Sequence, residues 1–305
     1  MYLKAFPPLY IKILKKEAQM KSFKSINLIV LAISITEIPV FSGNILSIED
    51  AAEKGLIKLS IKGKGGYTGD VIEMKIKNLT NQKLDLKVDA GKILDSKKND
   101  EQDLLVVRSQ DFFVDAHQLK TINVYGMCCQ AHKASPQANS DYTLGKWADT
   151  SLIKLACFID ENKQYSNHTA QQAVWTLSDS NSIASISGGE KEIITLFRKY
   201  VSKLTGREIP AYDITYLQES DHHVLGRAIK IEGIFEYSVP ENGKITIAIY
   251  DVSGNLVQLL FKNIPHKKGE CKLYYTFRTR NLNSGTYFAR MNMDGTVQKE
   301  MKIEF

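Results

Sequence analysis

Two runs of alternating apolar and polar residues, joined by a short turn, constrain the C-terminal part of this chain more than any other feature. The runs are Lys244–Asp251 and Leu256–Leu260, and the residues between them are Val252-Ser253-Gly254-Asn255. Alternation with a period of two places the apolar side chains on one face of a strand, and a turn of this composition joins antiparallel strands. Gln298–Phe305 continues the pattern. The sequence therefore predicts a C-terminal β-sandwich that ends on a strand.

Short alternating strands also fill the first half of the chain. In Ile57–Lys62 apolar residues alternate with Lys and Ser, and similar patterns recur in Ile72–Lys77 and Leu84–Val88. Several short strands at this spacing are typical of an antiparallel sandwich of immunoglobulin type. We therefore predict a mainly β protein with two immunoglobulin-like antiparallel sandwich domains, over residues 46–187 and 211–305, joined by a small helical region.

Three stretches have apolar residues at helical spacing. Residues 145–161 and 168–179 predict two helices appended to the first sandwich, and residues 188–210 predict a longer connecting helix. Asn167 or Thr169 can cap the second of these helices through its side-chain oxygen. The helical region thus divides the two predicted sandwiches.

The first 43 residues have the build of a leader. From Met20 a short basic region precedes the apolar run Ile26–Ile35, and small residues follow at Ser42 and Gly43. This order is typical of a secretory signal peptide cleaved near those two residues, and the apolar run is too short to span a bilayer. We predict an exported protein with no membrane span after cleavage; a retained, membrane-anchored N-terminus is the alternative. Because Met20 begins a complete signal by itself, translation of residues 1–19 stays open.

The positive charge of the chain belongs mostly to this leader. The formal net charge is +6, and residues 1–42 contribute +4 of it through six lysines and two glutamates. The remaining charge of about +2 is too small for the footprint of a polyanion-binding protein. We therefore expect no nucleic-acid partner.

Four cysteines follow the leader. In an oxidising compartment one disulfide is predicted, between Cys128 or Cys129 and Cys157, and we take Cys129 and Cys157 as the candidate pair. Cys271 lies in a strand pattern and is interpreted as a small buried residue. The absence of a Cys-x-x-Cys spacing argues against a zinc site.

No local motif predicts a metal or a catalytic centre. Asp221-His222-His223 are adjacent, and adjacent side chains in a strand or loop point in different directions. The chain has no Gly-x-Ser-x-Gly elbow, phosphate loop or dinucleotide fingerprint. We expect no metal, no cofactor and no catalytic residues, although carboxylates that only the fold assembles leave no trace in sequence spacing.

Three sequence segments near the C-terminus together form one recognisable pattern. They are Ile247–Gly254, Leu282–Phe288 and the lysine-containing last strand, and their order resembles the C-terminal sorting domain (type A) of the type IX secretion pathway of Bacteroidetes. The resemblance covers residues 234–305 and implies transport across the outer membrane by the export machinery, then release or surface attachment. The same strands would also suit an immunoglobulin-like or hook-capping-like module with a structural role. The motif residues are Tyr250, Asp251, Gly254, Gly285, Tyr287 and Lys302.

A second segment, Thr169–Trp175, follows a predicted helix that contains Leu155-Ala156-Cys157. Residues 145–180 resemble the Thr-Gln-x-Ala-type segment of bacterial thioester adhesin domains. In that family a cysteine thiol and a glutamine side chain form an internal thioester, which captures amines on a host or surface. The resemblance implies Gln172 as the glutamine and Cys128 or Cys129 as the cysteine. The alternative is that the segment packs a helix on the sandwich, with Gln172 hydrogen-bonded locally.

Together these patterns favour a non-enzymatic exported protein, secreted or held on the outer cell surface after passing through the periplasm. Its first domain would be a binding or adhesion module for an unknown surface ligand or protein. The exposed strand edges and the loops 95–103 and 130–145 are its expected contact regions. A secreted hydrolase with its site in the helical region is one alternative, and a structural component of a surface assembly is another.

Overall fold

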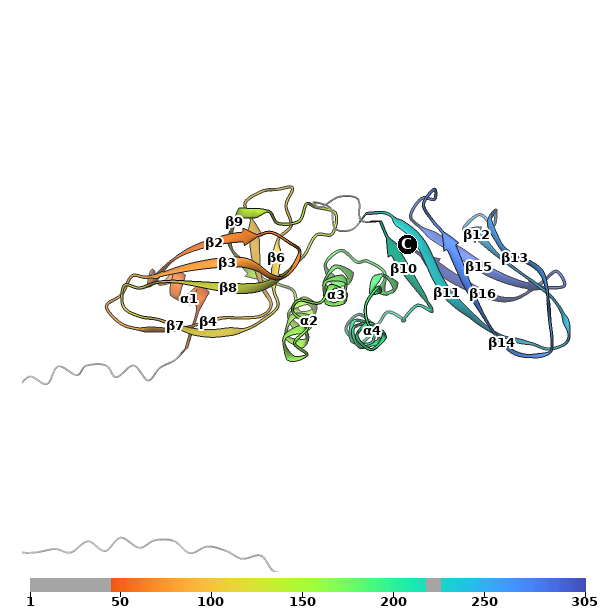
Figure 1. The fold of residues 1–305 in the computed structure, drawn as a ribbon, viewed down its shortest axis with the longest axis horizontal. Coiled ribbons are helices and arrows are strands. Elements are labelled where there is room, and N and C mark those ends of the chain that lie inside the picture. The colour runs from red at the N-terminus through yellow and green to blue at the C-terminus, as the bar shows by residue number, and fades with distance from the viewer. Residues whose placement is uncertain (1–44, 218–225) are drawn as a thin grey trace, which may run out of the picture. The chain divides into compact units, whose positions relative to one another are not determined.

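The computed structural model describes residues 45–217 and 226–305 (Figure 1). The predicted leader and Asp221-His222-His223 lie outside the described residues. The described chain is mainly β, with several sheets and three α-helices of more than ten residues. Among the described residues, no helix combines the length and the apolar character needed to cross a membrane.

The first domain is built on a closed barrel of six strands. Apolar residues at alternate positions of these strands point inward, as Ile72, Met74 and Ile76 of β3 do, and are fully buried. Strands β9 and β2 pair with each other and close the barrel. In order around the barrel the strands are β2 (Ile57–Lys64), β3 (Thr68–Asn78), β8 (Leu119–Cys128), β6 (Leu104–Val106), β5 (Lys92–Ser96) and β9 (Ala138–Trp147).

A smaller sheet completes this domain. Strand β1 (Leu46–Ser47) pairs with β4 (Leu84–Val88), which pairs with β7 (Gln110–Val114), and helix α1 (Ile48–Glu53) follows β1 directly. Residues of this sheet and of the barrel share one apolar core. The prediction of many short strands is confirmed, but the two open sheets expected of a sandwich are replaced here by a closed barrel and a three-stranded sheet.

Three helices pack on one another after the barrel. Helix α2 (Thr150–Glu161) begins at Asp149, whose side chain accepts hydrogen bonds from two main-chain N–H groups. Its predicted start was wrong, because residues 145–147 belong to β9. Helix α3 (His168–Ser178) is capped by Asn167 and confirms the helix predicted over 168–179. Helix α4 (Lys191–Thr205) ends at Gly206, whose φ of 71° favours glycine.

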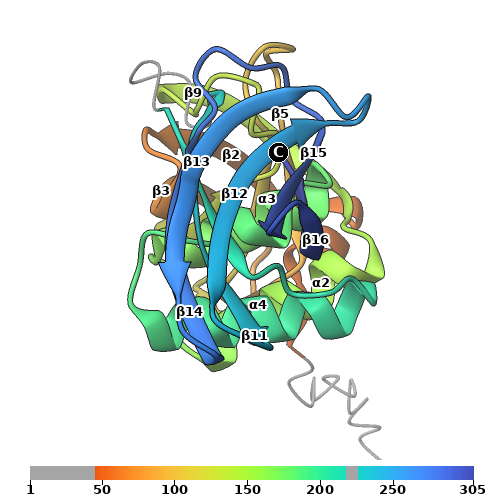
Figure 2. The ribbon, with the colours of Figure 1, turned by 90° about the vertical axis from the view of Figure 1, so that its right-hand side faces the viewer.

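The C-terminal domain consists of two sheets that share one apolar core. Strands β12 and β13 run antiparallel side by side (Figure 2) and confirm the predicted hairpin. In its turn, Asp251 accepts hydrogen bonds from Ser253 N and Asn255 N, and Gly254 has a φ of 82°. One sheet contains β10 (Tyr212–Tyr216), β11 (Ala228–Val239) and β14 (Gly269–Arg278); the other contains β13 (Leu256–His266), β12 (Gly243–Asp251), β15 (Thr286–Met293) and β16 (Thr296–Glu304).

Candidate functional site

A buried glutamine on helix α3 holds the end of strand β8. Gln171 Nε2 donates to Cys128 O at 2.8 Å, and Gln171 Oε1 accepts from Cys128 N at 2.9 Å. Both residues are fully buried. A carboxamide that bonds both main-chain groups of one residue takes the place of a neighbouring strand. The structure therefore fixes the Gln171 carboxamide directly beside Cys128.

Helix α3 presents different faces to two cores. Trp175 packs in the barrel core together with Cys128, whereas Ala170 packs in the core between the helices and the barrel. Residues four positions apart lie on the same helix face, so Gln171 and Trp175 both face the barrel. The Trp175 indole also donates to Gln102 Oε1 at 3.3 Å. This face docks α3 on the barrel end.

Tyr67 and His168 lie beside the buried pair. The Tyr67 ring stacks on Trp175 with 6.2 Å between ring centroids, and its hydroxyl is hydrogen-bonded to His168 Nδ1 at 3.2 Å. Tyr67 O accepts from Cys128 N at 3.3 Å. Burial, and then the Cys128 thiol, raises the pKa of Tyr67, and desolvation lowers the pKa of His168. Both side chains are therefore neutral at pH 7.

All four cysteines carry free thiols in the structure. Burial, with the nearby Cys129 and Glu101, raises the pKa of the Cys128 thiol well above its usual range. Burial, with Asp103, raises the pKa of the Cys129 thiol. Cys129 is enclosed in the core beneath the helices, whereas Cys157 is exposed on α2. The candidate Cys129–Cys157 bridge is thus not formed here.

Gln172, the glutamine that the sequence resemblance implies, makes a different hydrogen bond. Its Oε1 accepts from Ser187 N at 2.8 Å, and no described contact joins its side chain to Cys128 or Cys129. The structure brings Cys128 together with Gln171 instead, one position earlier. The signal that identifies Gln171 is its spacing of four from Trp175, the large aromatic residue of the barrel-facing side.

A cavity of about 300 Å³ adjoins this region. Tyr67, His168 and Gln172 contribute one wall, and strands β10 and β11 contribute the wall that carries Asp213 and Glu232. Among the described residues, no group of three or more His, Cys, Asp or Glu side chains is arranged to hold a metal ion. The remaining lining residues are Ser187, Gly188, Ile214, Thr215 and Tyr216.

A buried carboxylate anchors the two loops predicted as contact regions. Glu101 is 2% exposed; its Oε1 accepts from Tyr142 OH at 2.8 Å and its Oε2 from Ser140 Oγ at 2.6 Å. Lys98 forms an ion pair with the same carboxylate at 3.4 Å. Burial and Glu101 raise the pKa of Tyr142, which keeps the phenol protonated as a donor. The bases of loops 95–103 and 130–145 are therefore fixed to each other.

The C-terminal motif residues hold the last strand in place. Gly285 N donates to Phe305 O at 2.8 Å, and the Tyr287 ring stacks on the Phe305 ring with 5.1 Å between centroids. The Tyr287 hydroxyl donates to Asn283 O at 2.9 Å, and Lys302 pairs with Glu304. The Tyr250 ring lies 4.9 Å from the Arg290 guanidinium, and Asp251 and Gly254 form the β12–β13 turn.

This strand arrangement coincides with a known family. Residues 231–304 match the family model of the secretion system C-terminal sorting domain. Residues 231–304 are a sorting domain. Such a domain marks its protein for the type IX secretion machinery, so this protein is exported to the cell surface or secreted. The sorting domain thus includes β12, β13, β14, β15 and β16 and most of β11.

Other comparisons add no further family. No curated protein matches the chain in sequence. Among solved structures, red sea bream transglutaminase overlaps 84% of this chain and 33% of its own, with 9% identity and a TM-score of 0.19. DesR, a β-glucosidase from Streptomyces venezuelae solved with D-glucose, overlaps 82% of this chain and 48% of its own, with 6% identity and a TM-score of 0.18. The chain spans less than half the length of either protein, and neither overlap is close enough to define the fold.

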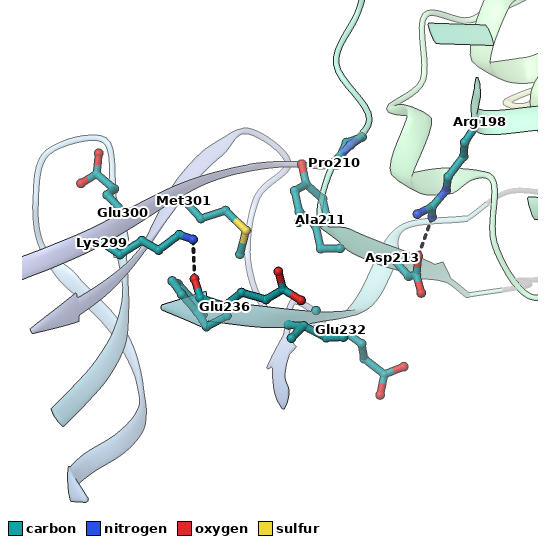
Figure 3. A pocket seen from close by; sticks show the side chains of 13 residues that line it. Arg198, Pro210, Ala211, Asp213, Glu232, Glu236, Lys299, Glu300 and Met301 are labelled. Carbon is teal, nitrogen blue, oxygen red and sulfur yellow. Dashed lines mark hydrogen bonds and ion pairs between the residues drawn. The ribbon is translucent and has the colours of Figure 1, made fainter. Parts of the chain in front are cut away.

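The sorting domain borders a second cavity of about 580 Å³ (Figure 3). It lies where β10 and β11 approach β16, and Lys299 reaches across it to donate to Glu236 O. On its other side Arg198 pairs with Asp213 at 2.5 Å. Lys299 thus joins β16 to β11, and Arg198 joins helix α4 to β10. We therefore centre the candidate site on the smaller cavity, which adjoins Tyr67 and His168.

Proposed function

We propose that this exported protein is a non-enzymatic adhesion module, whose first domain attaches covalently to its target through an internal thioester between Cys128 and Gln171. The observation that carries the proposal is the buried Gln171 carboxamide, bonded to both main-chain groups of Cys128. A structural clamp alone requires the carboxamide but does not require a thiol at the residue that it clamps.

The proposed chemistry has two balanced steps. First, the Cys128 sulfur attacks the Gln171 carboxamide carbon; the new C–S bond replaces the C–N bond, and the thiol proton leaves with the nitrogen as ammonia. Second, a target amine attacks the thioester carbonyl, and the new amide bond releases the Cys128 thiol with one of the amine protons. Full burial of both residues excludes water, which would otherwise hydrolyse the thioester.

Intact mass spectrometry of the exported protein, denatured without added nucleophile, tests the thioester. The wild-type protein is expected to be lighter by one ammonia than its sequence requires, with one of its four cysteines resisting alkylation. Cys128→Ser and Gln171→Ala should each restore the full mass for their sequences. The matched controls Cys129→Ser and Gln172→Ala should keep the loss.

Two results would contradict the proposed thioester between Cys128 and Gln171. A wild-type protein with full mass and four alkylated cysteines excludes the thioester and leaves Gln171 as a structural clamp. Loss of the thioester in Gln172→Ala but not in Gln171→Ala would return the assignment to the residue that the sequence first indicated. Methylamine added to the wild-type protein should become attached at Gln171, which peptide mapping would detect.

The sorting domain makes a separate prediction about export. Deletion of Ile231–Phe305 should retain the protein in the periplasm, because the element that the type IX machinery recognises is then absent. Immunoblots of periplasmic and surface fractions would measure this. A truncated protein that still reaches the surface in wild-type amounts would contradict a sorting role for this domain, whatever the state of the thioester.

A further inference from the structure

We propose, building on the thioester function, that the captured amine enters through the cavity between Tyr67 and Glu232 and belongs to a molecule with a second positive charge, such as a polyamine or a basic peptide segment. Tyr67 connects the two places: its main-chain oxygen accepts from Cys128 N, and its side chain lines the cavity. Tyr67 therefore borders both the cavity and the buried Cys128–Gln171 pair.

The charge of the cavity lining is negative. Asp213 and Glu232 contribute two carboxylates, and the described lining contains no lysine or arginine. The lowered pKa of His168 leaves its imidazole uncharged at pH 7, and burial raises the pKa of Tyr216 to about 12, so its phenol is uncharged as well. A concave site of one sign concentrates ligands of the opposite sign.

Both carboxylates already have one cationic neighbour each. Asp213 Oδ1 pairs with Arg198, and Glu232 Oε2 pairs with Lys230 at 2.8 Å. These side chains remain about half exposed, at 55% for Asp213 and 48% for Glu232, so each can still face a ligand. Pairs of this exposure are weak and exchange readily with an incoming cation.

The aromatic part of the lining suits a cation. The phenol rings of Tyr67 and Tyr216 provide π-surfaces that attract ammonium groups. Gln172 is 8% exposed, and its Oε1 accepts from Ser187 N at 2.8 Å.

A second charge on the ligand follows from the chemistry. The amine that attacks the thioester must be deprotonated, so it cannot remain an ammonium ion beside a carboxylate while it reacts. A second cationic group on the same molecule can stay charged and hold the reacting nitrogen in the cavity. The two carboxylates therefore bind a second cationic group on the target molecule and do not bind the amine that reacts.

This arrangement gives the sorting domain a role after export. Glu232 lies within residues 231–304, so the domain that addresses the protein also supplies a carboxylate to the cavity. Release of the protein without this domain would remove that carboxylate. The preference for dicationic amines is then a property of the full-length chain.

The test compares cadaverine, which carries two amines, with pentylamine, which has one amine on a chain of the same length. The release of the Cys128 thiol is followed at low ionic strength in the full-length protein. Beyond the statistical doubling for two amines, the wild-type protein should react about fivefold faster with cadaverine, as expected for a half-exposed charge pair. Glu232→Gln should lower the ratio of the cadaverine rate to the pentylamine rate toward the statistical factor of about two.

Glu241→Gln is the matched control, because it removes an exposed carboxylate of the sorting domain that does not line the cavity. It should keep the cadaverine preference. Equal rates for the two amines in the wild-type protein, or an unchanged preference in Glu232→Gln, would overturn the assignment. A wild-type protein without a thioester, counted by thiol alkylation before any amine is added, would instead refute the proposed function and this inference with it.

Discussion

In a Cys128→Ser protein, which keeps the Gln171 carboxamide intact, replacing Gln171 by alanine is expected to lower the free energy of unfolding by about 3 kcal/mol, because two buried main-chain groups of residue 128 lose a hydrogen-bond partner. Each such group costs about 1–3 kcal/mol when left unpaired, and the 3.3 Å bond from Cys128 N to Tyr67 O recovers only part of this. The serine background is needed because the proposed thioester expels the Gln171 Nε2 donor as ammonia. Chemical denaturation at equilibrium measures the change.

Gln172→Ala is the neighbouring control for this effect. Its side chain supplies one acceptor, to Ser187 N, so the expected loss is about 1 kcal/mol. Equal losses for the two variants would mean that the Gln171 carboxamide is not clamped on strand β8. Gln171→Ala made in the wild-type and in the Cys128→Ser background should therefore separate the loss of the thioester from the loss of the clamp.

The strands and helices were largely accessible from the sequence, because local periodicity determines them. The hairpin at Gly254 and the helix capped by Asn167 both follow from residues close together in the chain. Closure of the barrel was not accessible in this way. It depends on pairing between β2 and β9, which are more than seventy residues apart, and alternation is the same in a barrel and in a sandwich.

Local sequence patterns were also insufficient to predict the individual residues of the candidate site. The resemblance implied Gln172 with Cys128 or Cys129, whereas the glutamine that bonds Cys128 in the structure is Gln171. Which of two adjacent glutamines faces the barrel depends on how α3 rotates against two separate cores, and that rotation is set by Trp175 and its stacking on Tyr67. Tertiary packing, not local propensity, therefore selects Gln171.

The cavity was beyond sequence reasoning for another reason. Its two walls come from Tyr67 on one side and from Asp213 and Glu232 on the other, so no spacing along the chain relates them. Contacts between residues distant in the chain bring these walls together; one example is Ser187 Oγ, which donates to Ile214 O at 2.9 Å.

Arg198→Ala is expected to lower the free energy of unfolding by about 3 kcal/mol. Its guanidinium is nearly buried and donates to Ile186 O at 2.9 Å and Ala184 O at 3.0 Å, besides pairing with Asp213. Removal leaves two main-chain carbonyls without these donors. Because Asp213 is half exposed, the loss of the ion pair itself adds little.

Lys199→Ala, on the exposed face of the same helix, should change stability by less than about 0.5 kcal/mol. Limited proteolysis extends the comparison, since weaker contacts between α4 and β10 should increase cleavage between the helices and the sorting domain in Arg198→Ala alone. Equal cleavage of both variants would show that Arg198 does not join these elements. Increased cleavage together with a lost cadaverine preference would tie the contact to the cavity, because Asp213 lines the cavity and bonds to Arg198.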